Sequence, residues 1–129
     1  MILLDTHIWV WWMSDKGRLR KSHRALLESS GETFGVSVIS CWEVAKLVEN
    51  GRLVLDQPVE VWISRALTKP GLQLLPITLE ISIESTQLPQ PFHRDPADQM
   101  IVATARHNRL RLLTEDDRIL AYAHVQTVP

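Results

Sequence analysis

Short apolar runs alternate with segments of helical periodicity along this chain of 129 residues. The runs lie at residues 2–4, 34–39, 72–77 and 111–114, with a possible fifth at residues 125–128. This alternation is typical of strands joined by helices, and short apolar strands are typical of a parallel sheet that is covered on both faces. The sequence therefore predicts an α/β fold around a central, mainly parallel sheet of four or five strands.

The helical segments carry recognisable start and stop signals. Ser40-Cys41-Trp42-Glu43 has the pattern of a capping box, which predicts a helix that begins at Ser40 with Glu43 in its first turn. Gly51 is placed to end that helix. Asp95-Pro96 predicts an N-cap followed by proline at the first helical position. Further helix starts are predicted at Pro58 and Thr78, and a last short helix at residues 118–123.

Four carboxylates lie where a predicted strand ends or a predicted helix begins: Asp5, Glu43, Asp98 and Asp116. In a parallel sheet these points lie on the same rim, and ligand crevices of open α/β sheets form there. Clustered carboxylates repel one another, and burial raises the cost. Since hard cations prefer oxygen ligands, the four acids together predict a metal site.

Most of these acids also have an ordinary structural explanation. Glu43 would complete the capping box, Asp98 would suit the helix dipole, and Asp116 could be a turn residue. Asp5 is harder to explain in this way, because it follows a buried-looking strand and has no obvious cation beside it in the sequence. The joint placement of the four acids, more than any single one, favours a functional site.

Composition restricts the class of protein. With 45% hydrophobic and 22% charged residues, the chain has the profile of a soluble globular protein, and its length predicts a single domain over residues 1–129. The one cysteine, Cys41, excludes an internal disulfide framework and a multi-cysteine zinc site, which fits a cytoplasmic location. No apolar run approaches the ~20 residues of a membrane span, and the N-terminus has no signal-peptide pattern.

The charge balance leans basic once the four candidate acids are set aside. The net charge is −1, from 14 Lys and Arg against 15 Asp and Glu, and without the four acids the count is 14 against 11. Basic residues gather at residues 16–24 and again at residues 106–111. Both groups are suited to phosphate contacts, but a solvated helix face and a cationic helix end are the favoured interpretation of these groups alone.

Four segments of the chain match a known family in order and spacing: Leu3-Leu4-Asp5-Thr6-His7, Ser37-Val38-Ile39-Ser40-Cys41-Trp42-Glu43, His93-Arg94-Asp95-Pro96-Ala97-Asp98-Gln99-Met100-Ile101-Val102-Ala103 and Leu112-Leu113-Thr114-Glu115-Asp116. Through them the chain resembles the PIN-domain ribonucleases, specifically the VapC-type toxins of bacterial toxin–antitoxin pairs. The resemblance covers essentially the whole chain. It implies a PIN-like three-layer α/β/α fold.

The resemblance also implies the ligand set. Asp5, Glu43, Asp98 and Asp116 would form an acidic site for one or two Mg²⁺ or Mn²⁺ ions. The hydroxyl of Thr114 would line this site and hydrogen-bond a carboxylate or a metal-bound water.

Two neighbouring acids leave the ligand set open. Asp95 lies one helical turn from Asp98 and either could be the main ligand, although the family pattern favours Asp98. Asp117 adjoins Asp116, and the family's Thr-x-Asp pattern selects Asp116.

Three further side chains near the acids have uncertain or ordinary roles. Gln99 stands where many relatives carry Arg, which puts a contact from that side chain in doubt. His7 and His93 lie near the acids in sequence; they are suited to contact the scissile phosphate, but hydrogen-bonded structural groups are the favoured interpretation.

By resemblance the chain is expected to be a metal-dependent endoribonuclease, in which metal-activated water cleaves RNA and leaves a 5′-phosphate and a 3′-hydroxyl. A cognate antitoxin would neutralise it, and a homodimer is expected. The apolar run at residues 8–13 either faces such a partner or thickens the core. An RNA-processing PIN nuclease without an antitoxin and a non-catalytic PIN scaffold remain as alternatives, and the target RNA stays open.

Other proteins with acidic or phosphate-binding α/β sites fit less well. A phosphotransfer receiver domain needs a lysine beyond the last strand, and this chain has none after Lys69. A haloacid-dehalogenase-type phosphatase needs Asp-x-Asp where this chain has Asp5-Thr6-His7. The five glycines are dispersed, so no glycine-rich phosphate loop is present.

Overall fold

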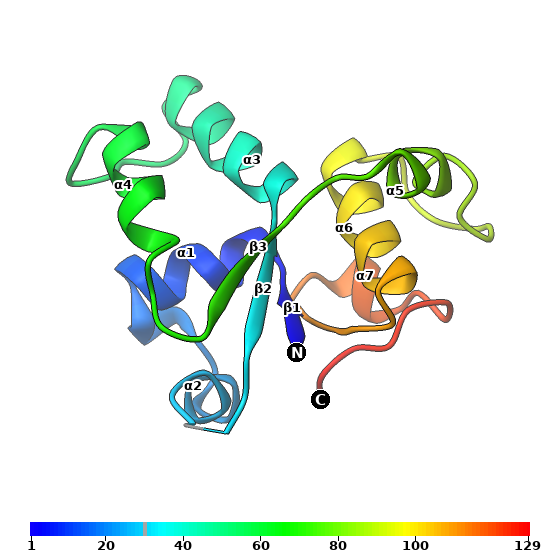
Figure 1. Cartoon of the computed structure of the whole chain (residues 1–129), viewed down its shortest axis with the longest axis horizontal. Helices are drawn as coiled ribbons and strands as arrows, with labels where there is room; N and C mark the ends of the chain where they lie inside the picture. The colour runs from blue at the N-terminus through cyan, green and yellow to red at the C-terminus, as the bar shows by residue number, and fades with distance from the viewer. Residues whose placement is uncertain (30) are drawn as a thin grey trace.

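The computed structural model describes residues 1–29 and 31–129 of the chain. Its four strands form one parallel sheet in the order β3-β2-β1-β4 (Figure 1). The strands are β1 (Ile2–Leu4), β2 (Phe34–Ser37), β3 (Leu72–Leu75) and β4 (Arg111–Leu113). The predicted α/β class with a parallel sheet is confirmed. At the possible fifth strand the structure has only a single parallel bridge, between Leu112 and Thr127.

Helices cover both faces of the sheet and complete three layers. The helices are α1 (Thr6–Ser14), α2 (Lys21–Leu27), α3 (Val38–Glu49), α4 (Val59–Ala66), α5 (Leu79–Glu84), α6 (Pro96–His107) and α7 (Asp117–Leu120), with a short 3-10 helix η1 (Lys16–Arg18). Figure 1 shows α1 to α4 on one side of the sheet and α5 to α7 on the other. None of the helices in the described part of the chain is long and apolar enough to cross a membrane.

Each face of the sheet packs against its own apolar cluster. Ile2 and Leu4 point into a cluster with α1, α2, α3 and α4, whereas Leu3 points into a second cluster with α5, α6 and α7. Successive side chains of a strand face opposite ways, so one short strand contributes to both clusters. Because all three side chains are almost fully buried, β1 is the centre of the molecule.

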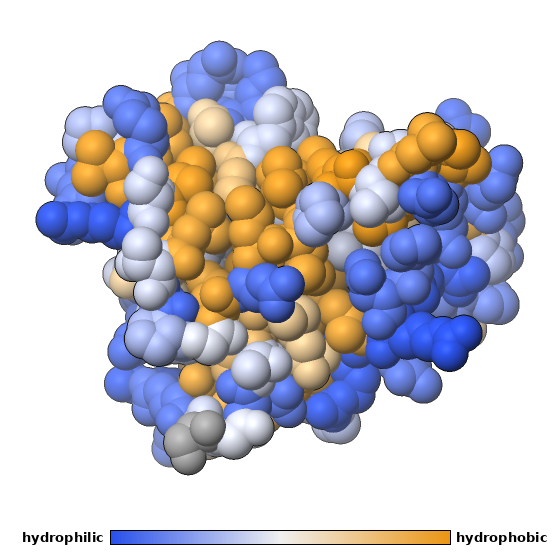
Figure 2. All heavy atoms as spheres, in the orientation of Figure 1, coloured by the Kyte–Doolittle hydropathy of each residue, from blue (hydrophilic) through white to orange (hydrophobic). Residues whose placement is uncertain are grey.

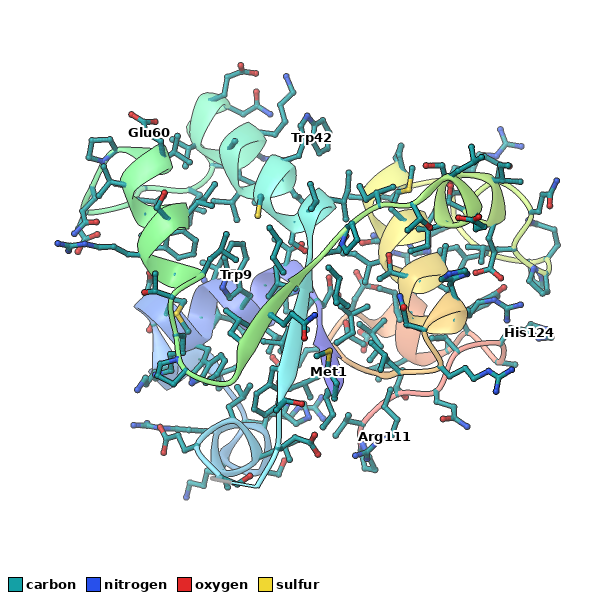
Figure 3. The ribbon with its side chains drawn as sticks, in the orientation of Figure 1. Met1, Trp9, Trp42, Glu60, Arg111 and His124 are labelled. Carbon is teal, nitrogen blue, oxygen red and sulfur yellow. The ribbon has the colours of Figure 1, made fainter. Side chains whose placement is uncertain are left out.

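The apolar run at residues 8–13 lies mostly in the core. Trp9 is fully buried and packs edge-on against Trp62, with the ring centroids 5.2 Å apart. Trp12 packs in the same way on Phe34 at 5.4 Å. Figure 3 shows Trp9 inside the molecule near α1 and α4. Only Trp11 and Met13 in this run keep partial exposure, so the run mainly thickens the core.

The predicted capping box is wrong, and the error changes the reading of Glu43. Strand β2 ends at Ser37, and the extended backbone of Ser37 lets its Oγ accept from the N–H of Ile39 at 3.1 Å. Helix α3 therefore begins at Val38, two residues before the predicted start at Ser40. Ser40 lies inside the helix, where its Oγ accepts from the Thr6 hydroxyl at 2.8 Å. Glu43 is in the second turn and has no capping role.

The other helix signals hold at α6 and near the end of α3. Asp95 is the N-cap of α6, its Oδ1 accepting from the Asp98 N–H at 2.9 Å, and Pro96 follows at the first position. Gly51, just beyond α3, has φ +72°, which glycine adopts without steric cost. The last helix was predicted over residues 118–123 and instead spans Asp117–Leu120, because Asp116 caps it through the N–H groups of Arg118 and Ile119.

We expect Ile8→Ala to lower the free energy of unfolding by about 2–5 kcal/mol, because its fully buried side chain would leave a cavity between α1 and the sheet. Leu120→Ala removes the same number of carbon atoms from a side chain that is 37% exposed, so it should cost no more than about 1 kcal/mol. Urea unfolding of both variants measures the difference. Equal losses would contradict the placement of residues 8–13 in the core.

Candidate metal centre

A pocket of about 250 Å³ opens at the carboxyl edge of the sheet. It lies where β1 ends, beside α1 and α3 and at the N-termini of α6 and α7. Five carboxylates line it: Asp5, Glu43, Asp95, Asp98 and Asp116. The structure thus brings together all four acids that the sequence singled out, with Asp95 added. Asp117 is exposed and does not line this pocket.

Asp5 is the most buried of the five acids, at 3% exposure. Its backbone N–H donates to the carbonyl of Leu113 at the end of β4, which fixes Asp5 between two strands. Its Oδ1 accepts from the Thr6 N–H at 2.8 Å, and its Oδ2 accepts from the Thr114 hydroxyl at 2.6 Å. Thr114 Oγ1 also accepts from the N–H of Asp116 at 3.0 Å, so one hydroxyl connects two acids of the pocket.

Three of the acids form the tightest group. Glu43, Asp95 and Asp98 each offer one carboxylate oxygen, and these oxygens lie within 4.8 Å of one another. Asp98 is buried and Asp95 is exposed at the mouth. The sequence left open which of the two aspartates would be the main ligand, and in the structure both belong to the group. This arrangement of oxygens could hold a metal ion.

Glu43 combines a raised pKa with a buried carboxylate oxygen that has no hydrogen-bond partner among the described residues. Burial is the main cause that raises its pKa to about 7; the Thr6 hydroxyl opposes the rise, and the negative charges of Asp5, Asp98 and Asp95 each add a smaller increase. Its buried Oε1 has no hydrogen-bond partner among the described residues. A buried carboxylate oxygen without a donor is costly, and a cation would compensate it.

Asp98 is held by two cationic or potentially cationic side chains. Burial raises its pKa, while the hydrogen bond from His93 opposes the rise. Its Oδ2 lies 2.6 Å from His93 Nε2 and 3.6 Å from Arg118 Nη2. The sequence expectation that His93 is a hydrogen-bonded group is confirmed, whereas Arg118 was missed. The signal available was a cation two residues beyond Asp116.

The pKa of Asp116 shifts in the opposite direction from those of Glu43 and Asp98. Burial alone would raise its pKa, but the N–H groups of Ile119 and Arg118 and the Arg118 charge outweigh it, so the pKa is lowered. Arg118 Nη2 lies 3.6 Å from Asp116 Oδ2, as it does from Asp98. Asp116 therefore stays ionised beside groups that resist ionisation. An arginine bridging two carboxylates marks the mouth of the pocket.

Two other side chains near the acids have structural contacts. His7 Nε2 accepts from the Glu115 N–H at 3.1 Å, which leaves Nδ1 protonated and facing Asp5 Oδ2 at 3.6 Å. The expectation of a hydrogen-bonded structural group is confirmed for His7 as well. Gln99 donates to the backbone carbonyl of His93 at 3.1 Å, and it does not line the acidic pocket.

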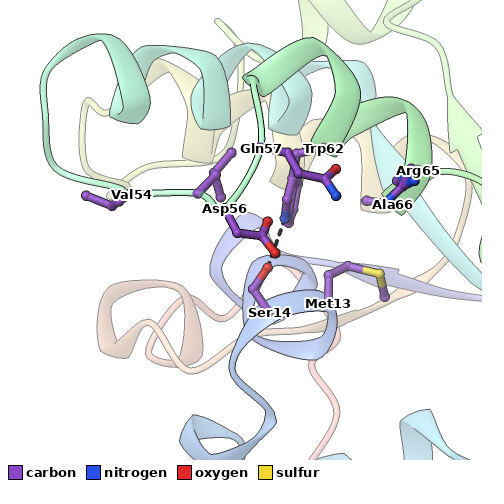
Figure 4. Close-up of a pocket in the computed structure, with 9 residues that line it drawn as sticks. Met13, Ser14, Val54, Asp56, Gln57, Trp62, Arg65 and Ala66 are labelled. Atoms are coloured by element: carbon purple, nitrogen blue, oxygen red, sulfur yellow. Dashed lines mark hydrogen bonds between the residues drawn. The ribbon is translucent and has the colours of Figure 1, made fainter.

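A larger pocket, of about 460 Å³, lies at the other end of α1 (Figure 4). There Trp62 Nε1 donates to Ser14 Oγ at 2.9 Å, and the polar side chains of Asp56 and Arg65 lie at its edge. It contains a single carboxylate, so it offers no cluster for a cation. Size alone does not identify a reaction site, and the smaller acidic pocket has the convergent chemistry.

These residues fit a hard divalent cation. All the candidate ligand atoms are carboxylate oxygens, the class of ligand that Mg²⁺ and Mn²⁺ prefer. Burial, with a smaller contribution from the neighbouring acids, raises the pKa values of Glu43 and Asp98, and a cation would offset both effects. The orphaned Oε1 of Glu43 gives such an ion an oxygen that no described protein group uses.

Comparison with known proteins agrees with this site. The PIN domain family matches residues 2–125. The chain is 33% identical over 127 residues to Ribonuclease VapC22 of Mycobacterium tuberculosis, covering 98% of this chain and 95% of that protein.

Two solved structures share the fold. One is a toxin–antitoxin complex from Klebsiella pneumoniae, whose matching chain is 23% identical with a TM-score of 0.67 over 98% of this chain and 97% of that one. The other is VapBC2 from Rickettsia felis bound to a promoter DNA fragment, with 16% identity and a TM-score of 0.74 over 99% and 98%. With the family match spanning nearly all of its length and a relative one-third identical over almost the whole of both chains, this chain belongs to the PIN-domain family, in its VapC-type branch.

Proposed function

We propose that the chain is a metal-dependent endoribonuclease and the toxin of a toxin–antitoxin pair. The observation that carries the proposal is the convergence of five carboxylates on one pocket at the carboxyl edge of a parallel sheet. Supporting it, a chain one-third identical over nearly its full length is a ribonuclease of the VapC type. RNA is the proposed substrate, and the cytoplasm the proposed place of action.

The proposed cofactor is Mg²⁺ or Mn²⁺, as one or two ions. Glu43, Asp95 and Asp98 would hold an ion, with Asp5 and Asp116 at its border. A divalent cation bound there supplies charge stabilisation for a phosphodiester undergoing hydrolysis and lowers the pKa of water.

The chain's own groups have separate tasks in this proposal. Glu43, whose buried Oε1 has no hydrogen-bond partner among the described residues, would hold the ion. Thr114 holds the carboxylate of Asp5 in one orientation through Oδ2. His93 does the same for Asp98. Fixed carboxylates cost no reorganisation at the moment of reaction, which is the physical basis of such catalysis.

Two protein partners are proposed. One is a cognate antitoxin, since a structural neighbour is a toxin–antitoxin complex. The other is a second copy of the chain. Apolar residues gather between α4 and α5 on the face shown in Figure 2. We call the exposed residues there the α3–β3–α5 face, and they are Val38, Trp42, Leu74, Leu79 and Ile83. Contiguous exposed apolar patches mark contact surfaces.

The dimer proposal predicts a change of mass when this face becomes charged. Trp42 is 51% exposed and points outward from α3 (Figure 3), so Trp42→Glu should leave the monomer folded and disfavour association. Sedimentation equilibrium measures the mass of both proteins. Leu120→Glu, on the exposed surface of α7, is the control and should behave as wild type. A wild-type monomer at all concentrations would exclude the proposal.

The nuclease proposal is tested with labelled total RNA and purified protein, freed of any antitoxin. We expect discrete cuts with Mg²⁺, and we expect them to vanish in EDTA and in Asp5→Asn, which removes a buried carboxyl group from the pocket. Asp56→Asn changes an exposed aspartate of the other pocket and should cut normally. Cutting that survives in both EDTA and Asp5→Asn would place the nuclease activity elsewhere.

The raised pKa of Glu43 has a consequence for the metal-free protein. The pKa of Glu43 is about 7 in the folded protein and 4.5 in the unfolded chain, so the folded protein binds this proton more tightly. The stabilisation that the bound proton gives is complete below about pH 4.5 and is lost as the pH rises through 7. We therefore expect the free energy of unfolding of wild type, measured with urea in EDTA, to fall by on the order of 1 kcal/mol between about pH 5 and about pH 8 relative to that of Glu43→Gln. A difference that does not change with pH would refute the raised pKa.

A further inference from the structure

The acidic pocket has an apolar wall that a metal site does not need. Val10 and Trp11 of α1, Leu47 of α3 and Leu53 of the segment after α3 line it beside the carboxylates. Cations and phosphates are bound by charged and polar groups, whereas an apolar wall beside them is typical of a pocket that also takes the body of an organic ligand. The ligand of this pocket should therefore have both a charged and an apolar part.

Trp11 gives the wall a fixed aromatic surface. It is partly exposed, unlike Trp9 and Trp12 on the same helix. The ring of His7 lies 4.9 Å from it, centroid to centroid, and the Arg18 guanidinium lies 4.8 Å from the ring centroid. These contacts hold the indole in place, and because the Arg18 guanidinium lies over the ring, a base can stack only on the part of the indole that Arg18 and His7 leave open. The basic stretch at residues 16–24 thereby reaches the neighbourhood of the pocket.

Two arginines also line the pocket and supply charge for phosphates. Arg118 bridges Asp98 and Asp116 at 3.6 Å from each. Arg52 is exposed, and no carboxylate of residues 1–29 or 31–129 lies within ion-pair distance of it. An unpaired arginine beside five acids is suited to a ligand that brings its own negative charge.

We propose that this wall is a nucleobase subsite: the base of the nucleotide beside the cleaved phosphate stacks on Trp11, and Arg52 contacts the adjoining phosphate. Bases of every kind stack on aromatic side chains, and Arg binds phosphate readily. The inference rests on the proposed nuclease function and deepens it.

The subsite also defines the class of RNA. A base inside a duplex has both faces covered by its neighbours and cannot stack on a protein side chain. A pocket of about 250 Å³ has no room for a base pair with its stacked neighbours. The base at the cut site must therefore be unstacked when it binds, which an unpaired nucleotide in a loop, a bulge or a single strand allows without the cost of opening a base pair.

The test measures binding without cleavage, using full-length protein with Asp98→Asn in the presence of Mg²⁺. The probes are a short fluorescein-labelled single-stranded RNA with all four bases and a strand of equal length that is abasic at every position. Both carry the same phosphates, so their difference reports contacts to bases. Fluorescence anisotropy should give tighter binding of the base-containing strand by about fivefold to 150-fold.

Substitutions then assign that difference to Trp11. Trp11→Leu keeps an apolar side chain and should abolish the preference for bases, whereas Trp11→Phe keeps an aromatic face and should retain most of it. Arg52→Gln should weaken both strands alike, and Arg65→Gln, at the other pocket, should weaken neither. The comparison of strands on the Trp11-containing protein remains valid even if a Trp11 variant fails to fold.

Three results would overturn the inference. These are equal binding of the two strands, a base preference that survives in folded Trp11→Leu, and no binding of either strand. The second would assign the wall to another occupant, such as a side chain of a protein partner. Cleavage of total RNA by wild type is a separate readout, so the nuclease proposal can stand while the subsite falls.

Discussion

The burial of several carboxylates in one pocket is the constraint on which the whole site depends. The parallel sheet and its helices bring five acids to one pocket, and two of them, Glu43 and Asp98, resist ionisation there. Such a cluster destabilises the metal-free chain unless something compensates the burial and the repulsion of its carboxylates. A hard cation does so by binding the same carboxylate oxygens.

The acids of the pocket differ in the hydrogen-bond donors that the protein provides for them. The carboxylate of Asp5 accepts hydrogen bonds from Thr6 and Thr114, and that of Asp116 accepts from the N-terminus of α7, so both have donors within the protein. Glu43 has an oxygen with no partner among the described residues. This asymmetry separates carboxylates that are already fixed from one that is free to bind an ion or a proton. It also explains why one pocket can contain groups with opposite pKa shifts.

The sequence predicted the strands, the parallel sheet and the convergence of the four acids, because short apolar runs and acids at their ends are local patterns. It misplaced the start of α3, since Ser37 and Ser40 are both good caps and only the length of β2 decides between them. The choice between Asp95 and Asp98 stayed open because both lie at the start of α6, which places both near the pocket. The wall of Trp11, Leu47 and Leu53, with Arg52, depends on how α1 packs beside α3, and no local pattern contains that information.

The most direct test of the account is a calorimetric titration of the metal-free protein with Mn²⁺. Wild type should bind the ion and release protons at neutral pH, because Glu43 must lose its proton when a cation takes its place. Asp98→Asn should bind much more weakly, and Asp56→Asn, from the other pocket, should bind as wild type does. Equal Mn²⁺ affinity in wild type and Asp98→Asn would contradict a metal centre at these carboxylates.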